Sequence, residues 1–457
     1  MLHFVVKGGI INMLNILCFL FKKKKEMSME ILKINVGGFR NISSTSLSLN
    51  KITALVGLNG YGKSNIMEAI DFGFDFIRGT NASKAALMKM KQCIPLLKSN
   101  VGKDYSFDIL LKMETKNGSC FINYGYSFSW ETEKHPSKII SEYLKIKKDD
   151  KNQKYISYIS RNESSAKYKS SETGRCSKSI NIENNALVLN KLIALDDLFY
   201  LDILERLNSI EFFIEKHLDA SPSFAPDPFV VKGFQELELQ GIQSIPRAIF
   251  FLKKDFSDKY ELLINDFRQL FPDVIDVNVQ EIKLNNTTKL KLSDDAPFVF
   301  TDSIYSMSII DDKMVQPINF ENLSDGTKRI FLMLTFAVIA DIKNLSIISI
   351  EEPENSIHPN LLQNYLDVLS QLVNNCKIII SSHSPYIVQY LDPRCIYIGF
   401  LTDSGEAEFK KIASNKANRL IKDATTFNNS VGDYIFSILS SSDAEEYLKE
   451  YVENDVE

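Results

Sequence analysis

An apolar run, a polar turn and an amphipathic segment follow one another early in the sequence. Residues 52–56 are apolar or β-branched, as in a buried strand, and residues 57–64 have the form Gly-x-x-x-x-Gly-Lys-Ser. After this turn, apolar side chains recur at the spacing of one helix face, at Ile66, Ile70, Phe74 and Ile77. The pattern predicts a strand, a tight loop and a helix in direct succession.

The residues of the turn are of the kind that holds a phosphate group. Gly57, Gly60 and Gly62 allow successive backbone N–H groups to point inward, and a helix that begins near Lys63 adds the positive end of its dipole. Lys63 is expected to reach the β- and γ-phosphates of a bound nucleotide, and Ser64 to supply a hydroxyl ligand to Mg²⁺. The predicted nucleotide-binding residues of this loop are Asn59, Gly60, Tyr61, Gly62, Lys63, Ser64 and Asn65. The alternative is a glycine-rich turn without a ligand, which the strand-to-helix context disfavours.

Other segments have weaker patterns. Residues 29–36 alternate imperfectly and predict an edge or meander strand, and the segments that begin at Tyr105 and Cys120 predict antiparallel strands. Residues 185–218 and 228–271 are expected to be mainly helical, with a break at Pro246. Further strands are expected at residues 274–284, 289–292 and 305–310 and as a pair at 397–409, and helices at 413–420 and 432–452.

Residues 134–178 carry 12 Lys and Arg against 5 Asp and Glu in a Ser-rich setting. Such a segment is typical of a solvated insertion or a mobile loop. The alternative is a surface for a phosphate backbone or an acidic partner, because Tyr155, Tyr158 and Tyr168 are interleaved with the charges. The net charge of the whole chain is −5, so a contact with DNA would depend on a local basic surface of this kind.

Three further motifs follow between residues 322 and 385. In the first, a polar turn precedes an apolar helix pattern at residues 330–339, and its free N–H groups could face an anion. Its candidate nucleotide-binding residues are Ser324, Asp325, Gly326 and Thr327. On its own this pattern is that of an ordinary helix N-cap.

In the second motif, residues 345–350 predict a buried strand that ends in Glu351 and Glu352. Because neighbouring strand residues point to opposite sides, we assign Glu351 to Mg²⁺ and Glu352 to the attacking water. In the third motif, a strand at residues 377–382 ends at His383, which would sense or stabilise the γ-phosphate. A charged strand end and a structural histidine are the alternatives, and the order of the motifs favours the catalytic interpretation of Glu352, His383 and Lys63.

Together these motifs resemble the ATP-binding-cassette type of nucleotide head found in the RecF, SMC and OLD-like group of ATPases. Residues 57–64 match the Walker A motif, 323–327 the signature loop, 347–352 the Walker B motif, 355–358 the D-loop and His383 the switch histidine. The resemblance implies an α/β fold: a P-loop head with a mixed sheet, flanking helices and an antiparallel β subdomain, and a helical or mixed insertion. Two features depart from the pattern. Glu351 stands where many heads have Asp, and Gln92 is only a weak candidate for the Q-loop glutamine.

The resemblance also implies partners. In such heads the signature loop of one copy completes the nucleotide site of another, so self-association in a head-to-tail dimer or a higher oligomer is expected. Residues 324–329 and 351–359 resemble the compact ATPases of bacterial antiviral systems such as Septu, PARIS and some retron systems. A phage-derived trigger would then be one partner. The effector, a nuclease of the Toprim or HNH type, would be a separate protein, because only 72 residues follow Pro385. The alternatives are a RecF-like DNA repair or recombination ATPase that clamps DNA and, less suited to these motifs, a transporter ATPase.

Composition adds little to this picture. Hydrophobic residues at 44% and charged residues at 24% are typical of a globular protein, and the six cysteines have no metal-ligand spacing, so we expect a reducing, cytoplasmic setting. Residues 9–21 form an apolar run followed by four lysines, too short for a membrane span. We expect the first 26 residues to be a translated ribosome-binding region ahead of a native start at Met27 or Met29. The alternative is a weak membrane anchor. We expect no stable membrane association.

The expected organisation has five parts. Residues 1–28 are a non-native extension or weak N-terminal segment, 29–130 the N-terminal half of the ATPase head, and 131–315 an insertion or helical arm that includes the basic segment. Residues 316–412 are the C-terminal half of the head, and 413–457 a helical end with an acidic tail.

Overall fold

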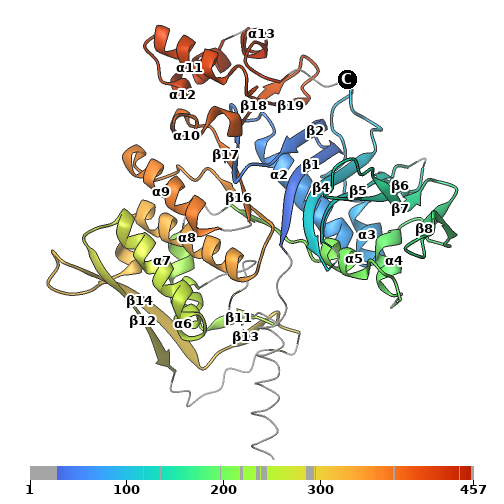
Figure 1. Ribbon diagram of the computed structural model, residues 1–457. Coiled ribbons are helices and arrows are strands. Elements are labelled where there is room, and N and C mark those ends of the chain that lie inside the picture. Colours follow the sequence, from blue (N-terminus) through green and yellow to red (C-terminus); the bar gives the residue numbers. More distant parts are fainter. Residues whose placement is uncertain are drawn as a thin grey trace, which may run out of the picture.

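A 14-stranded mixed sheet runs through the protein and helices pack against it (Figure 1). The computed structural model describes residues 28–116, 118–133, 135–195, 197–216, 220–232, 237, 244–284, 293, 295–373, 376–441 and 443–453. The strand expected at residues 289–292, the first 27 residues and the last four therefore lie outside the described residues. The predicted α/β fold with a mixed sheet is confirmed.

The nucleotide-binding motifs lie in the parallel part of the sheet. Its strands, in spatial order, are β10 (Phe212–Glu215), β16 (Ile347–Glu351), β17 (Lys377–Ser382), β3 (Ile52–Val56) and β18 (Ile396–Leu401), and β19 (Ala407–Lys411) pairs antiparallel to β18. Every residue of β3 is buried, as are four of the five residues of β16. Both faces of these strands are covered, which is why their sequences are continuous apolar runs.

The other part of the sheet is antiparallel. Its strands, in spatial order, are β2 (Ile42–Ser48), β1 (Met29–Phe39), β4 (Tyr105–Thr115), β5 (Gly118–Ser129), β6 (Lys138–Lys148), β7 (Ile156–Arg161), β8 (Ala166–Lys169) and β9 (Cys176–Ser179). The strands expected at Tyr105 and Cys120 are thus confirmed. The edge position considered for residues 29–36 is wrong, because β1 lies between β2 and β4.

The basic segment does not form a loop. Residues 138–179 supply the four strands β6 to β9, in contrast to the expected mobile insertion. In β6, Ile139, Leu144 and Ile146 are buried while Lys145 is exposed. Lys145 is therefore on the outer side of an alternating pattern whose other side faces the core.

Helices on this side of the molecule pack on the antiparallel strands. The helix after the phosphate-type loop, α2 (Lys63–Arg78), buries Ile66, Ile70, Phe74 and Ile77 completely, as the sequence predicted. Three shorter helices lie near it: α3 (Asn81–Leu87), α4 (Val188–Ile193) and α5 (Leu201–Asn208). Residues 185–218 are thus helical only in part, since β10 also belongs to them.

A second core gathers around α8 (Asp325–Ile342). Its other elements are η1 (Ser221–Phe224), α6 (Ile245–Asp255), α7 (Ser257–Leu270), η2 (Phe320–Asn322), α9 (Pro359–Leu372) and a small sheet of β12 (Val274–Lys283), β14 (Ser303–Asp311) and β15 (Ile318–Asn319). A short ladder of β11 (Phe229–Val231) and β13 (Phe298–Phe300) lies nearby (Figure 1). In the described residues, the helix expected at residues 228–271 is found only from Ile245 onward, because Phe229–Val231 form the strand β11. Pro246 lies in the first turn of α6, behind the N-cap Ser244, where its missing N–H costs nothing, and the break between α6 and α7 falls at Phe256.

The C-terminal residues form a helical layer next to β18 and β19 (Figure 1). It contains α10 (Pro385–Tyr390), η3 (Pro393–Cys395), α11 (Ala417–Thr426), α12 (Val431–Leu439) and α13 (Ala444–Lys449), so the helices expected here are confirmed with shifted bounds. Among the described residues, no helix combines the length and apolar character that a membrane crossing needs. The five cysteines in the described ranges are all free.

Candidate nucleotide-binding site

The site begins where three neighbouring parallel strands end. In the ladders, Glu351 of β16 lies opposite Ser381 of β17, and Ser382 lies opposite Val56 of β3. Backbone hydrogen bonds continue beyond the strands, from Glu352 N to the Ser381 carbonyl at 2.9 Å. The segments after β3, β16 and β17 therefore meet at one edge of the sheet, the position where parallel α/β sheets bind ligands.

The loop after β3 is shaped by two glycines. Gly60 and Gly62 have φ angles of 84° and 82°, in the left-handed region that favours glycine. At Gly62 a Cβ would also lie 2.8 Å from the Cβ of Ala407 in β19. Gly62 caps α2, so the loop delivers the N-terminus of a 16-residue helix to the sheet edge.

Lys63 is held inside this loop. Its Nζ donates hydrogen bonds to the carbonyls of Gly57 at 2.8 Å and Leu58 at 3.0 Å, and the residue is 8% exposed. Burial lowers the pKa of the Lys63 ammonium, and three nearby carboxylates oppose this shift: Glu352, Glu354 and Glu351. The predicted lysine at the start of α2 and both predicted glutamates at the end of β16 are thus brought together.

Other predicted residues of the loop differ in exposure. Asn59, Gly60 and Ser64 are exposed, and Tyr61 is half-buried. Asn65 is half-buried because its amide donates to Asn41 at 2.7 Å and its carbonyl accepts from Arg40 at 2.8 Å.

Arg40, for which the sequence favours a solvated loop position over one near the nucleotide base, lies beside this loop and is well paired. It has a φ of 47°, pairs with Glu68 of α2 at 2.5 Å and donates to the backbone carbonyl of Gln92 at 3.0 Å. These contacts join the β1–β2 turn, α2 and the loop that carries Gln92. The exposed Gln92 therefore lies next to the predicted phosphate loop, through Arg40 and Asn65.

Glu352 and His383 form the central polar contact of the site. Oε1 of Glu352 and Nδ1 of His383 are 3.1 Å apart. The direction of Glu352 does not come from strand alternation, as we had expected, because β16 ends at Glu351 and Glu352 has a φ of 46°. Such a conformation is strained for a non-glycine residue and is typical of functional sites. The turn aims the second carboxylate at the neighbouring strand end.

Two residues of the site were missed by the sequence analysis. Glu354 accepts a hydrogen bond from the Ser382 hydroxyl at 2.6 Å, and burial raises the pKa of Glu354. Arg329 of α8 is 1% exposed and donates to the carbonyls of Glu351 at 2.7 Å and Glu352 at 3.1 Å. The signal for Arg329 was weak, since a charged residue two places after a polar turn normally lies in solvent.

The signature-type loop makes contacts of its own. Ser324 is the N-cap of α8, and its hydroxyl accepts from the N–H of Thr327 at 3.2 Å. Gly326 lies against the segment that we compared with a D-loop, because a Cβ there would be 2.3 Å from the Ser356 carbonyl. Among the described residues, no hydrogen bond or ion pair of Ser324–Thr327 reaches residues 57–65. The same chain therefore does not join its two predicted anion-binding loops by direct polar contacts.

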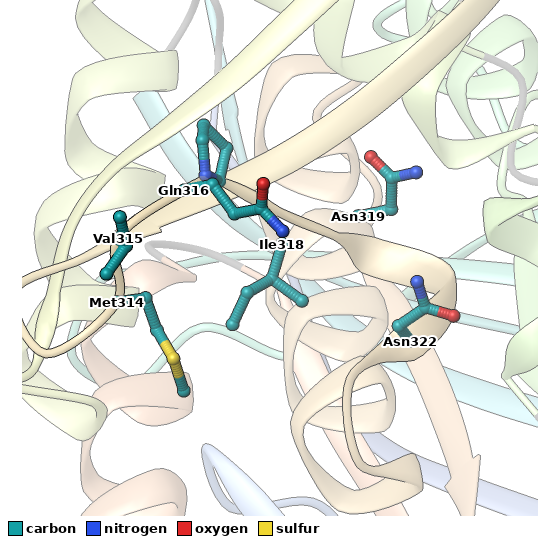
Figure 2. Close-up of a pocket in the computed structure, with 7 residues that line it drawn as sticks. Met314, Val315, Gln316, Ile318, Asn319 and Asn322 are labelled. Atoms are coloured by element: carbon teal, nitrogen blue, oxygen red, sulfur yellow. The ribbon is translucent and has the colours of Figure 1, made fainter.

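A pocket of about 570 Å³ opens beside this loop, in the turn between β14 and η2. Figure 2 shows Met314 and Val315 at one side and the amides of Asn319 and Asn322 at the other. Val315 is fully exposed and Met314 is 55% exposed.

Comparison with known proteins agrees with these features. The sequence matches the family model described as AAA ATPase domain over residues 29–388. The chain belongs to this family. The predicted relation to the ATPases is thereby confirmed. This match does not extend to the resemblance to antiviral systems. No curated protein matches the sequence.

Several solved structures are similar to this AAA ATPase at low identity. The SMC head bound to the C-winged helix domain of ScpA has 15% identity and a TM-score of 0.49, and the match covers 85% of this chain and 99% of that one. The SMC head domain from Thermotoga maritima has 12% identity and a TM-score of 0.40, and the match covers 84% of this chain and 99% of that one. The Smc head domain with an extended coiled coil, bound to the C-terminal domain of ScpA and derived from Pyrococcus furiosus, has 13% identity and a TM-score of 0.41. The match covers 87% of this chain and 100% of that one.

Membership of this family implies a nucleotide and, as a rule, Mg²⁺. The residues at the end of β16 fit the ion, because Oε1 of Glu351 is buried and has no hydrogen-bond partner among the described residues. Burial raises the pKa of Glu351, while Lys216 and a hydrogen bond with Ser64 act in the opposite direction. A free carboxylate oxygen beside a serine hydroxyl is the oxygen donor set that Mg²⁺ takes from a P-loop protein, with phosphates and waters completing its shell. Ser64 and Glu351 are therefore the residues that could hold the metal.

Proposed function

We propose that this AAA ATPase hydrolyses ATP at the edge formed by the ends of β3, β16 and β17. The observation that carries the proposal is the 3.1 Å contact between Glu352 and His383, a carboxylate and an imidazole that directly follow two adjacent strands, β16 and β17. It is supported by the buried Lys63, because the Glu352 carboxylate is near enough to raise the pKa of the Lys63 ammonium against the effect of burial. Lys63 contacts the β- and γ-phosphates, and Ser64 with Glu351 holds Mg²⁺, which neutralises phosphate charge when bound.

The proposed roles of the two central residues follow from their geometry. Glu352 accepts a proton from the attacking water or positions it in line with the γ-phosphate. His383, 45% exposed at the end of β17, orients Glu352 through Nδ1 and contacts the γ-phosphate. Arg329 holds the backbone of both glutamates from behind. The carboxylate is thus kept at the sheet edge by contacts from β17 and α8.

We also propose that ATP joins two copies head to tail. Ser324 is exposed at the N-terminus of the 18-residue helix α8, where the positive end of the helix dipole is available to an anion held by another molecule. The exposed Met314 and Val315 near it would add apolar contact area. In this arrangement the phosphate loop of one copy and the signature-type loop of its partner enclose one triphosphate.

The test is the mass of the protein in solution, with and without ATP and Mg²⁺, combined with phosphate release. Lys63→Ala is expected to lose nucleotide binding. Glu352→Gln is expected to bind ATP, to lower turnover by about a hundredfold or more, and to accumulate the associated form, since it removes the proton acceptor but keeps the size of the side chain. The matched control is Glu261→Gln, the same change at an exposed position of α7, which should behave as the parent.

Two results would refute parts of this proposal. Turnover at the parental rate in Glu352→Gln would show that Glu352 does not act on water. A protein that keeps one mass with and without ATP, in the parent and in Glu352→Gln alike, would rule out ATP-dependent association.

For the biological role, we propose a cytoplasmic sensor or scaffold of a prokaryotic antiphage system that holds or releases a separate nuclease-type effector. The support is the resemblance of residues 324–329 and 351–359 to compact ATPases of such systems. Expression of the chain with its neighbouring genes, followed by affinity purification and phage challenge, tests this role. A nuclease that copurifies and leaves the complex on phage infection is the expected result; a complex without a nuclease, and no protection from phage, would contradict it.

One observation favours the second candidate, a RecF-like ATPase that clamps DNA. The basic segment is a set of ordered strands with exposed lysines, among them Lys145, Lys167 and Lys178. A phosphate-binding surface of this kind gives affinity that falls steeply with salt. Titration of double-stranded DNA at several salt concentrations, with Lys145→Gln and Lys167→Gln combined as the variant, separates this candidate from the first.

A further inference from the structure

A segment rich in lysine lies directly beside the predicted phosphate loop. Residues 88–103, between α3 and β4, contain four lysines and no Asp or Glu, and we call them the lysine loop. The backbone of this loop is held at Arg40: the N–H of Leu96 donates to the Arg40 carbonyl at 3.1 Å, and the buried amide of Asn100 donates to the same carbonyl at 2.8 Å. The Arg40 guanidinium in turn donates to Asn65 at 2.8 Å. The lysine loop is therefore fixed next to the N-terminus of α2.

The lysine loop presents both apolar side chains and charges to solvent. Leu96 is 67% exposed and Val101 is 68% exposed. Lys91 and Lys98 are exposed as well, and within the described part of the chain the ion pairs of this loop belong to its other two lysines. Large apolar side chains flanked by ammonium groups of this kind fit a protein surface that is itself apolar and acidic.

A surface with that composition lies beside the signature-type loop. Residues 311–325, from the end of β14 to the first residue of α8, contain four acidic residues and one lysine, and we call them the acidic turn. The lysine, Lys313, is paired with Asp273 at 2.5 Å. Asp312 and Glu321 are exposed, and neither has an ion pair among the described residues. The acidic turn thus carries negative charge that its own surroundings leave unpaired.

The acidic turn also has apolar side chains. Val315 is fully exposed and Met314 is 55% exposed, and both lie at one side of the pocket in Figure 2. Within the described ranges, no hydrogen bond or ion pair joins the acidic turn to the lysine loop of the same chain. The two segments are complementary in charge and alike in apolar content, but one copy does not pair them with each other.

The head-to-tail arrangement proposed above brings these segments together. In that arrangement the phosphate loop of one copy and the signature-type loop of another enclose one triphosphate. The lysine loop is attached to the first of these loops through Arg40, and the acidic turn runs directly into the second at Ser324. Because a two-fold dimer repeats every contact, each dimer contains this pair of segments twice.

We propose that the lysine loop binds the acidic turn of a second copy of this chain, at the rim of the head-to-tail contact. Lys91 and Lys98 face the carboxylates of the acidic turn, and the exposed apolar side chains of the two segments cover one another. This inference rests on the proposed ATP-dependent association and names the surface that makes it specific. Exposed ion pairs add little to the stability of a contact, so they act mainly on partner choice and association rate, and salt screens both effects.

The experiment measures ATP-dependent association of the full chain by sedimentation at low salt, in the Glu352→Gln background. One variant reverses the charge of the lysine loop with Lys91→Glu and Lys98→Glu. The other reverses the acidic turn with Asp312→Lys and Glu321→Lys. Circular dichroism and a nucleotide titration check that the fold and ATP binding are unchanged.

The matched control is Lys151→Glu with Lys154→Glu, the same change at two exposed lysines between β6 and β7, which should associate as the unreversed protein does. Each reversal alone is expected to weaken association about tenfold or more, because like charges then oppose one another at both contacts of the dimer. An equimolar mixture of the two reversal variants should associate to within about threefold of the unreversed protein, since a mixed dimer has opposite charges at both contacts. At about 0.5 M salt these differences should shrink.

The possible failures are distinguishable. Reversal variants that associate like the control, or a mixture that stays as weak as each variant alone, overturn this proposal while the ATP-dependent association stands. Glu352→Gln without a reversal that keeps one mass with and without ATP refutes the association, and this contact with it. If the lysine-loop variant loses affinity for double-stranded DNA but associates normally, its lysines serve DNA and the proposal is overturned. If that variant does not fold, Lys91→Gln with Lys98→Gln replaces it, with an expected weakening of about threefold.

Discussion

Replacement of Arg329 by methionine is expected to reduce hydrolysis far more than ATP binding. Arg329 is fully buried in α8 and donates to the carbonyls of Glu351 and Glu352. Each hydrogen bond from a charged group contributes about 1.5–3 kcal/mol, so Arg329→Met costs about 3–6 kcal/mol if both carbonyls stay unpaired, and less where water reaches them.

The effect on turnover comes from the backbone of Glu352. Its φ of 46° corresponds to about 1–3 kcal/mol of strain, which contacts such as those of Arg329 must hold in place. If the turn relaxes, the carboxylate leaves its position beside His383, and kcat should fall about tenfold to a hundredfold, since about 1.4 kcal/mol corresponds to a factor of ten. Lys63 and Ser64 belong to α2, and Arg329 contacts Glu351 only at its backbone carbonyl, so the Kd for ATP should change by less than about threefold.

Phosphate release at saturating ATP gives kcat, and a fluorescent ATP analogue gives the Kd. Arg329→Lys is expected to lie between the parent and Arg329→Met, because an ammonium keeps the charge but lacks the fork that reaches two carbonyls. Arg394→Met is the control, since Arg394 is 60% exposed and pairs with Asp392 on the surface. A variant Arg329→Met with parental kcat, or with equal losses in kcat and ATP affinity, would refute this reasoning.

Two further predictions concern the P-loop helix. Gly62→Ala should weaken ATP binding strongly, because a φ of 82° disfavours a side chain and the new Cβ would lie 2.8 Å from the Cβ of Ala407. Gly60→Ala, which has open space around the new Cβ, should have a smaller effect in the same titration. Burial raises the pKa of Asp71 to about 7, and Asp75 acts in the same direction. Folding therefore favours protonated Asp71: its stabilising contribution is complete below the unfolded pKa of about 4 and is lost as the pH rises through about 7. The unfolding temperature of the parent should fall over this range relative to Asp71→Asn, and parallel curves would contradict the assignment.

The motifs could be found in the sequence because each is local. The strand, glycine-rich loop and helix at residues 52–78, the apolar strand that reaches Glu351 and the helix face of Ile66 and Ile70 follow from residue order and spacing alone, and the structure confirms these elements. Local patterns also predicted β4 and β5, whose alternation is regular. The basic segment was misjudged, because its lysines obscure an alternation that becomes clear only when β6 pairs with β5.

Only the tertiary structure decided which distant residues act together. Glu352 meets His383 because β16 and β17 are adjacent in the sheet, and its direction depends on a backbone turn that propensity does not predict. Arg329 reaches the carbonyls of Glu351 and Glu352 because α8 packs behind the end of β16, which buries a side chain that sequence alone places in solvent. Sequence spacing fixes the strand, loop and helix types, while contacts between elements far apart in the chain depend on how the sheet orders its strands.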